Sequence, residues 1–213
     1  MSFLKKLFGG NVVENAVQEA LNKVRKNPDE LTSWINLASA YNLAGNNEKA
    51  LEICNVLVKD HPNDLALWLT IATIHLDEDR ISEVIDAANK AISIQETPLA
   101  HTLIGRAYIK NKQWENAITE YKRVIGRDDK NAWAWYWLGV AYEETSDTQS
   151  ALSAYKKASE LDPNNVEVYK RIASVQLTLH NFDQAISAME QAARIEPKYK
   201  QMVRDMRDRL AKI

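Results

Sequence analysis

The feature of this sequence that most restricts its fold is a repeat with a period of 34 residues. Large ring side chains recur with spacings of 34, 33, 34 and 34 residues, at Trp34, Trp68, His101, Trp135 and Tyr169. Two further sets follow the same spacing, one of small residues and one mostly aromatic: Ala50, Val84, Ala117, Ala151 and Ala185, and Tyr41, His75, Tyr108, Tyr142 and Gln176. A fixed period of this length indicates one supersecondary unit stacked several times, because a single unit cannot bury its hydrophobic face.

The stretch 132–165 shows which secondary structure the sequence of each repeat unit predicts. From Trp135 to Tyr142, bulky and small residues at i, i+3, i+4 and i+7 form one helical stripe. A second stripe begins at Ala151 after a polar turn and stops at Pro163. The unit is therefore a helical hairpin, and stacking five of them gives a continuous core.

Composition agrees with a helical chain and narrows its chemistry. Six Gly and five Pro are too few for the turns of an all-β sandwich. A net charge of -2, from 27 basic and 29 acidic side chains, argues against nucleic acid as a partner. The single cysteine excludes an internal disulfide framework and a zinc site built from cysteines.

The hairpin at 132–165 resembles the tetratricopeptide repeat. The family pattern of a large aromatic, Leu-Gly, Tyr, Ala, an aromatic, Ala and Pro is present as Trp135, Leu138, Gly139, Tyr142, Ala151, Tyr155, Ala158 and Pro163. The resemblance covers about residues 31–199 and implies an all-α superhelix, the solenoid of this family. Departures cluster in the second repeat, where Asp79 stands at the usual turn glycine and His75 replaces Tyr.

The predicted organisation is an amphipathic tail at residues 1–10 followed by a single solenoid domain at 11–213. The domain divides into a half repeat, five full repeats and a cap helix: 11–30, then 31–64, 65–97, 98–131, 132–165 and 166–199, then 200–213. The cap helix carries apolar residues at helical spacing, which are Met202, Met206, Leu210 and Ile213. This organisation predicts twelve helices, one before the array, ten within it and one after.

No residue set in the sequence points to catalysis, a metal or a cofactor. The candidates are histidines and one thiol, namely His61, His75, His101, His180 and Cys54. A lone histidine without a spaced partner is not a ligand set, and Cys54 takes an aromatic position of the packing pattern. The sequence contains no phosphate-binding glycine loop, metal motif or nucleophile elbow. We therefore expect a protein that is not an enzyme.

The family resemblance implies that the first helix of each hairpin lines a concave surface, which binds segments of other proteins. Reading the groove positions off each repeat gives the candidate partner-binding residues Ile35, Leu69, Leu76, Leu99, Arg106, Ile109, Trp133, Tyr136, Val140 and Lys170. Their apolar excess favours docking of an apolar or amphipathic segment, with Trp133 and Tyr136 as anchors. The alternative is that superhelical curvature buries much of this surface between neighbouring first helices.

A more specific family function is not expected. Chaperone-binding members grip a C-terminal carboxylate with Lys, Asn and Arg at fixed groove positions. In the last three repeats those positions hold Thr102, Arg106, Trp137, Glu167 and Arg171, of which only Arg171 agrees. The earlier registers match nowhere, so a carboxylate-clamp co-chaperone is not predicted.

The first ten residues leave three alternatives open. Phe3, Leu4, Leu7 and Phe8 surround Lys5 and Lys6, a pattern that suits weak adsorption to a membrane surface. The same segment could serve self-association into a homo-oligomer, or be an ordinary mobile tail. No stretch approaches the length of apolar sequence that spans a membrane, so we expect a cytoplasmic protein.

Overall fold

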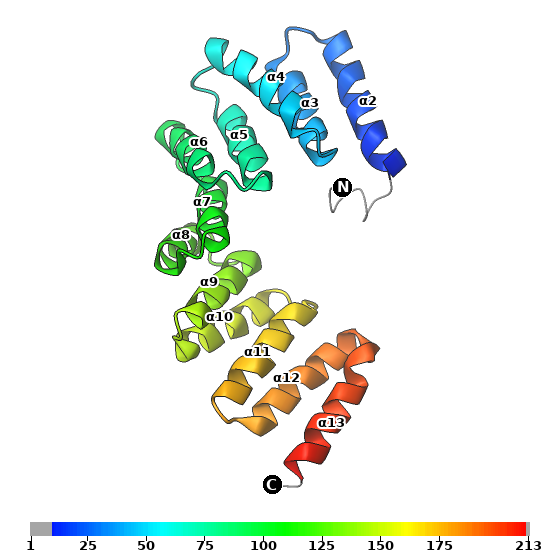
Figure 1. The fold of residues 1–213 in the computed structure, drawn as a ribbon, viewed down its shortest axis with the longest axis vertical. Coiled ribbons are helices and arrows are strands. Elements are labelled where there is room, and N and C mark those ends of the chain that lie inside the picture. Colours follow the sequence, from blue (N-terminus) through cyan, green and yellow to red (C-terminus); the bar gives the residue numbers. More distant parts are fainter. Residues whose placement is uncertain (1–9, 212–213) are drawn as a thin grey trace. The chain divides into compact units, whose positions relative to one another are not determined.

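A computed structural model describes residues 10–211. The predictions for the tail at residues 1–9 and for Ile213 lie outside these described residues. The twelve α-helices and one short 3-10 helix are α2 (Gly10–Lys26), α3 (Leu31–Leu43), α4 (Asn47–Asp60), α5 (Leu65–Asp77), α6 (Ile81–Ile94), α7 (Pro98–Lys110), α8 (Trp114–Arg127), α9 (Ala132–Glu144), α10 (Thr148–Leu161), α11 (Val166–Thr178), α12 (Phe182–Ile195), η1 (Pro197–Tyr199) and α13 (Lys200–Leu210) (Figure 1).

Successive helices form the predicted hairpins, and residues 10–211 contain no strand. The first helices, α3, α5, α7, α9 and α11, each have 13 residues. The second helices, α4, α6, α8, α10 and α12, each have 14. The predicted all-α solenoid class and the number of helices are confirmed for the described part of the chain.

The helices group into two compact units, one ending at Asn111 and the other beginning at Lys112. Unit 1 contains α2 to α7, and unit 2 contains α8 to α13. Each unit has its own apolar core, formed in unit 1 around Leu67 and Ile74 and in unit 2 around Tyr155 and Val168. The predicted single domain over 11–213 stays a prediction.

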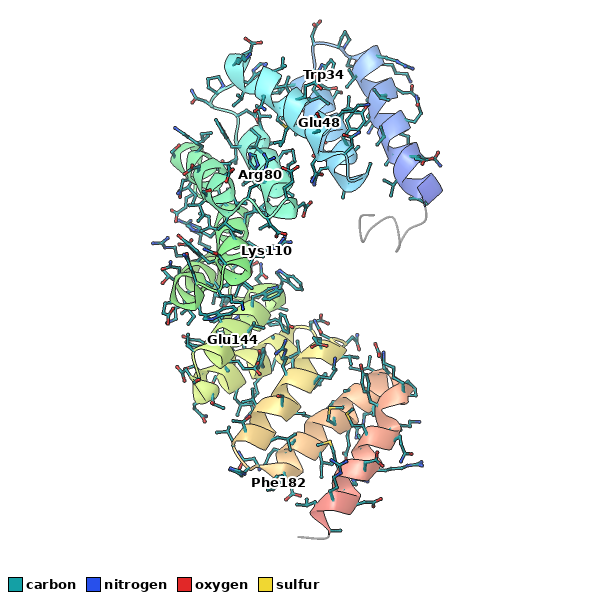
Figure 2. All side chains as sticks on the ribbon, in the orientation of Figure 1. Trp34, Glu48, Arg80, Lys110, Glu144 and Phe182 are labelled. Atoms are coloured by element: carbon teal, nitrogen blue, oxygen red, sulfur yellow. The ribbon has the colours of Figure 1, made fainter. Side chains whose placement is uncertain are left out.

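The ring positions of the repeat attach each first helix to the turn before it. The indole Nε1 of Trp34 donates to the Pro28 carbonyl at 2.8 Å, and that of Trp68 donates to Pro62 at 2.7 Å. In unit 2, Trp135 Nε1 donates in the same way to the Asp129 carbonyl at 2.9 Å. The ring thus fixes the start of the helix while its apolar body packs on the neighbouring helices, as the Trp34 ring does in the core cluster formed by α2 and α3 (Figure 2 labels Trp34). This contact explains why large rings recur once per period.

The small residues of the repeat allow the helices of a hairpin to approach closely. All five positions are fully buried, at Ala50, Val84, Ala117, Ala151 and Ala185. In unit 2 the same constraint appears at Gly139 on α9, where an added Cβ would lie 2.6 Å from two ring carbons of Tyr155. The Leu-Gly pair of the sequence pattern therefore provides space for the aromatic ring of the second helix.

The cap helix α13 differs in detail from its prediction. Val203 is its buried residue, and Met206 and Leu210 pack partly buried against the core of unit 2. Met202, predicted on the apolar stripe, is exposed, since the face of α13 that meets α12 is set by Val203. The prediction of the apolar stripe was therefore wrong at its first residue, because Val203 and not Met202 is buried.

Each hairpin turn contains one residue in the left-handed backbone conformation. Gly45 occupies it in the first repeat with φ 77°. Later repeats place a residue with a side chain there, and these are Asp79, Lys112, Ser146 and His180, with φ between 55° and 62°. In unit 2, the amide of Asp147 then donates to the Tyr142 carbonyl at 2.9 Å, which closes the end of α9. A left-handed residue with a Cβ is strained relative to glycine.

We expect Ser146→Gly to raise the free energy of unfolding by about 0.5 to 1 kcal/mol, because it relieves this strain. The reverse change, Gly45→Ala, should lower stability by about 1 kcal/mol. Urea unfolding followed by circular dichroism measures both values. A Ser146→Gly protein less stable than the wild type would contradict the account of the turn.

We expect Gly139→Ala to lower the free energy of unfolding by about 1 to 3 kcal/mol, because the methyl group overlaps the Tyr155 ring. Alanine favours a helix by about 1 kcal/mol over glycine, so the loss shows that packing exceeds propensity here. Gly126→Ala on α8 is the matched control, because nothing lies within 4 Å of its added Cβ. It should stabilise the protein slightly, and equal effects of the two changes would contradict the packing explanation.

Candidate functional site

The predicted groove residues lie on the first helices, on two faces that belong to different units. In unit 1 the face is carried by α3, α5 and α7, and the structure buries part of it. Ile35 is 8% exposed and Leu76 is fully buried, so neither is available to a partner there. Leu69, Arg106 and Ile109 are half-buried, and Leu99 is 52% exposed.

Contacts between neighbouring first helices explain the buried positions of unit 1. Helix α3 packs on α5, and α5 packs on α7. Asn42 Nδ2 donates to Asp77 Oδ2 at 2.9 Å, from α3 to α5. Lys110 Nζ donates to the Leu76 carbonyl at 2.9 Å, from α7 to α5 (Figure 2 labels Lys110). The prediction that all ten residues face a partner was therefore wrong for the buried Ile35 and Leu76.

In unit 2 the first-helix face carries a cluster of three aromatic rings on α9. Trp133 and Tyr136 stack with centroids 6.0 Å apart, and Trp137 meets both rings edge-on at 5.5 Å and 5.3 Å. Trp133 is 51% exposed, and Tyr136 is half-buried. Val140, one turn further along, is only 8% exposed and belongs to the core, so its predicted role on the face was also wrong. We call Trp133, Tyr136 and Trp137 the aromatic platform.

A polar network lies beneath the platform and joins three helices. Tyr136 lies 5.9 Å, centroid to centroid, from the Tyr155 ring of α10. The Tyr155 hydroxyl donates to Glu143 Oε2 on α9 at 2.6 Å. Arg171 Nη1 on α11 donates to the same carboxylate oxygen at 3.3 Å. The network holds α9, α10 and α11 in a fixed arrangement, which makes the platform rigid.

Two effects act on the ionisable groups of this network. Burial and the hydrogen bond to Glu143 raise the pKa of Tyr155 well above its ordinary value, so the phenol stays protonated. Lys170 on α11 donates to Glu167 Oε2 at 2.5 Å, and this hydrogen bond raises the pKa of Lys170. Lys170, predicted as a groove residue, is therefore a half-buried, paired cation.

Sequence reasoning missed the roles of Tyr155, Trp137 and Arg171. Arg171 and Glu143 are 28 residues apart, and no local pattern pairs them. For Trp137 the signal was present, because three of the five residues from Trp133 to Trp137 lie in the platform. Three large rings within one helical turn mark a surface that is packed on itself.

The side chains considered for catalysis take structural positions. His101 is buried, with Nε2 3.0 Å from Glu96 Oε1, and His61 and His180 are exposed in turns. Burial raises the pKa of Cys54 to about 12, so this thiol is not ionised at neutral pH. Residues 10–211 contain no group of three or more His, Cys, Asp or Glu side chains placed to hold a metal ion.

The repeat that forms the hairpins also matches the sequence models of a known family. Sequence models described as tetratricopeptide repeat match residues 33–64, 132–165 and 166–199, and one described as TPR repeat matches residues 105–146. The chain belongs to the tetratricopeptide repeat family. Proteins of this family are generally non-enzymatic, and their fold supports a role as a scaffold for protein–protein interactions.

Individual relatives of this tetratricopeptide repeat protein are distant in sequence. The tetratricopeptide repeat protein 21 homolog of Caenorhabditis briggsae is 24% identical over 119 residues, which are 55% of this chain and 9% of that protein. The structure of MamA from Desulfovibrio magneticus RS-1, residue 41 to the end, has a TM-score of 0.73 at 18% identity, covering 81% of this chain and 98% of MamA. YrrB, a tetratricopeptide repeat protein described as having an unusual peptide-binding site, has a TM-score of 0.67 at 17% identity, covering 88% of this chain and 96% of YrrB. These two structures show the shared fold.

The described helices of this tetratricopeptide repeat protein do not have the character of membrane-spanning segments. Among residues 10–211, none of the helices combines the length and the apolar character needed to cross a bilayer.

We expect Tyr155→Phe to lower the free energy of unfolding by about 1 to 3 kcal/mol at pH 7, because it removes the hydrogen bond of a buried phenol to the half-buried carboxylate of Glu143. The folded protein keeps this phenol protonated, whereas the unfolded chain loses the proton above its usual pKa of 10.0. Raising the pH through that value therefore destabilises the wild type relative to Tyr155→Phe. Guanidinium unfolding of both proteins from pH 8 to pH 11 measures the difference. A difference that stays constant, or grows, above pH 10 would contradict the network.

Proposed function

We propose that this protein is an adaptor or assembly factor that docks an apolar or amphipathic segment of a partner protein on its first-helix faces. Trp133 and Tyr136 anchor the segment in unit 2. The observation that carries this proposal is the exposed aromatic platform on a rigid base. Trp133 is 51% exposed, so the packing of the repeat does not account for a large aromatic side chain at this position.

The geometry of the platform suits binding of a protein segment. Large aromatic side chains with few rotatable bonds lose little entropy when a partner covers them, and they dominate the binding energy of interfaces. The Tyr155, Glu143 and Arg171 network holds the helices in place before the partner arrives, so little ordering remains for binding. A segment of apolar or amphipathic character would place its apolar side chains on Trp133 and Tyr136.

The expected affinity is moderate. A segment that buries about 500 Å² of apolar area gains about 12 kcal/mol at about 25 cal/mol/Å². An association cost of about 4 kcal/mol, at the low end of the usual range, leaves about 8 kcal/mol, which corresponds to a micromolar dissociation constant. Reversible docking of this strength suits an adaptor.

The accessible residues of unit 1 extend the proposal. Leu99 is exposed, and Leu69, Ile109 and the cationic Arg106 are half-buried. They offer a second face of the same apolar character, within unit 1, on which an apolar or amphipathic segment docks. YrrB, which shares the fold, is described as having an unusual peptide-binding site, and this supports peptide binding as a role for the present fold. Cytoplasmic location, weak membrane contact and homo-oligomer formation stay predictions from the sequence.

We expect Trp133→Ala combined with Tyr136→Ala to weaken partner binding by tenfold or more, because it removes both anchors. Partners are captured from an extract of the source cells on the immobilised wild type, and each isolated partner is then titrated against both proteins by calorimetry. Circular dichroism and thermal unfolding establish that the double variant is folded. Because Trp133 is the more exposed ring, Trp133→Ala alone repeats the test with less effect on the core.

The matched control is Phe182→Ala with Met202→Ala. Both side chains are exposed apolar residues of unit 2, on α12 and α13, and lie outside the aromatic platform. This control should leave affinity unchanged. A partner whose affinity is equal for the wild type and for the folded Trp133→Ala, Tyr136→Ala protein would overturn the proposal.

A further inference from the structure

The register of rings is broken at one place, on the cap helix α13. Thirty-four residues after Tyr169, the position that carries a ring in every hairpin is occupied by Val203. Pro197 precedes Val203 by six residues, as Asp129 precedes Trp135, whose indole Nε1 donates to the Asp129 carbonyl. A valine is too short to reach across to η1 as Trp135 reaches its turn. The start of α13 therefore lacks a ring at this register position, and the aromatic side chain of the junction is Tyr199 of η1, which packs half-buried against the core of unit 2.

An open pocket lies at this junction, between α12 and α13 of unit 2. Its volume is about 430 Å³, and its apolar lining consists of Ala193, Pro197 and Val203. These three residues come from α12, η1 and α13 in turn. Since Val203 is small, the lining leaves space of the kind that an aromatic side chain fills at the other junctions.

The remaining lining of the pocket is strongly basic. Its charged members are Arg194, Lys200, Arg204 and Arg207, together with one acid, Glu190. Arg207 pairs with Glu190, and Arg194 donates to Gln191 Oε1 at 3.3 Å. Within residues 10–211, Lys200 and Arg204 make no ion pair. At least two cations at the pocket thus have unmet charge, in a chain whose net charge is -2.

Charge on α13 is sorted by face. Lys200, Arg204 and Arg207 recur at i, i+4 and i+7 and line the pocket beside Val203. The acids of the helix, Asp205 and Asp208, are not among the lining residues, and Asp205 accepts a hydrogen bond from Gln201 at 2.9 Å.

We propose that this pocket, which we call the cap pocket, binds an acidic segment of a partner protein that presents one aromatic side chain. The aromatic ring enters the space beside Val203 and Pro197 and supplies the apolar contact that the chain's own register omits. The flanking carboxylates of the segment pair with Lys200, Arg204 and Arg194 around the rim. This surface is separate from the aromatic platform and does not depend on the proposed function of that platform.

The form of the pocket favours a protein segment over other anions. The pocket combines its cations with an apolar lining between α12 and α13, and a flat membrane surface presents no side chain that would fill this lining. A nucleic-acid backbone requires a longer basic track than one pocket. Carboxylates next to an aromatic residue satisfy both the charge of the rim and the apolar floor.

The test uses the full chain and fluorescein-labelled peptides followed by anisotropy. The first peptide has glutamates on both sides of a central tryptophan, the second has alanine in place of the tryptophan, and the third has glutamines in place of the glutamates. We expect the first to bind, the second to bind about tenfold more weakly, and the third not to bind at low salt. Binding of the first should weaken as salt is raised, because the rim charges are exposed.

Two variants locate the site. Val203→Trp restores the ring of the register and should abolish binding of the tryptophan peptide, and circular dichroism with thermal unfolding establishes that this variant is folded, because Val203 belongs to the core of unit 2. Arg194→Gln with Arg204→Gln keeps the pocket open and should weaken binding about tenfold. Lys156→Gln with Lys157→Gln on α10 removes the same charge from exposed positions outside the pocket, so it should have no effect beyond about twofold.

Four results would overturn the proposal. Equal affinity for the tryptophan and alanine peptides would mean that no ring enters the pocket. Equal weakening by the α10 control would mean that the peptide follows overall charge. Inorganic phosphate, or vesicles containing an anionic lipid, competing as strongly as the peptide would mean a general anion site. Unchanged binding in both folded pocket variants would place the peptide elsewhere.

Discussion

The contact between a tryptophan ring at the start of a first helix and the turn before it, found at Trp34, Trp68 and Trp135, is the interaction on which the stacking depends. In three repeats the indole Nε1 donates to a turn carbonyl six residues earlier, at 2.7 to 2.9 Å. The bond satisfies a backbone acceptor at a helix junction, and the apolar body of the ring packs between helices. The fully buried small residues then bring the second helices close. Because these contacts are internal, the residues left on the first-helix faces are free to differ from repeat to repeat.

In a chain of this kind, we expect function to depend on positions that differ from the packing pattern of the repeat. Trp133 lies only two residues from the structural ring Trp135, yet it is 51% exposed and stacks on Tyr136 instead of meeting a turn. The cap pocket shows the opposite case, in which the register omits a ring at Val203 and leaves basic side chains around the space. One surface adds an aromatic residue to the pattern and the other lacks one. These two departures from the repeat, at Trp133 and at Val203, each coincide with a surface that we propose for a partner.

The sequence predicted the hairpins, their number and the small buried residues, because local spacing and a fixed period determine them. It did not predict that Ile35, Leu76 and Val140 are buried, since that depends on how neighbouring helices pack. Contacts distant in sequence, such as Arg171 with Glu143, leave no local pattern. The cap pocket was missed because a valine in a helical stripe looks like an ordinary core residue. The direction in which a side chain points within the stacked array therefore cannot be predicted from the sequence and has to be taken from the structure.

The central claim is that a partner covers Trp133 and not the rings that hold the hairpins together. The most direct measurement is the nitrogen-15 NMR spectrum of the six tryptophan indoles, recorded as an isolated partner segment is added to the full chain. The account predicts that the Trp133 signal shifts with saturation, whereas the signals of Trp34 and Trp68, whose N–H groups are bonded to their own turns, stay in place. A saturated complex in which the Trp133 signal does not move would contradict it.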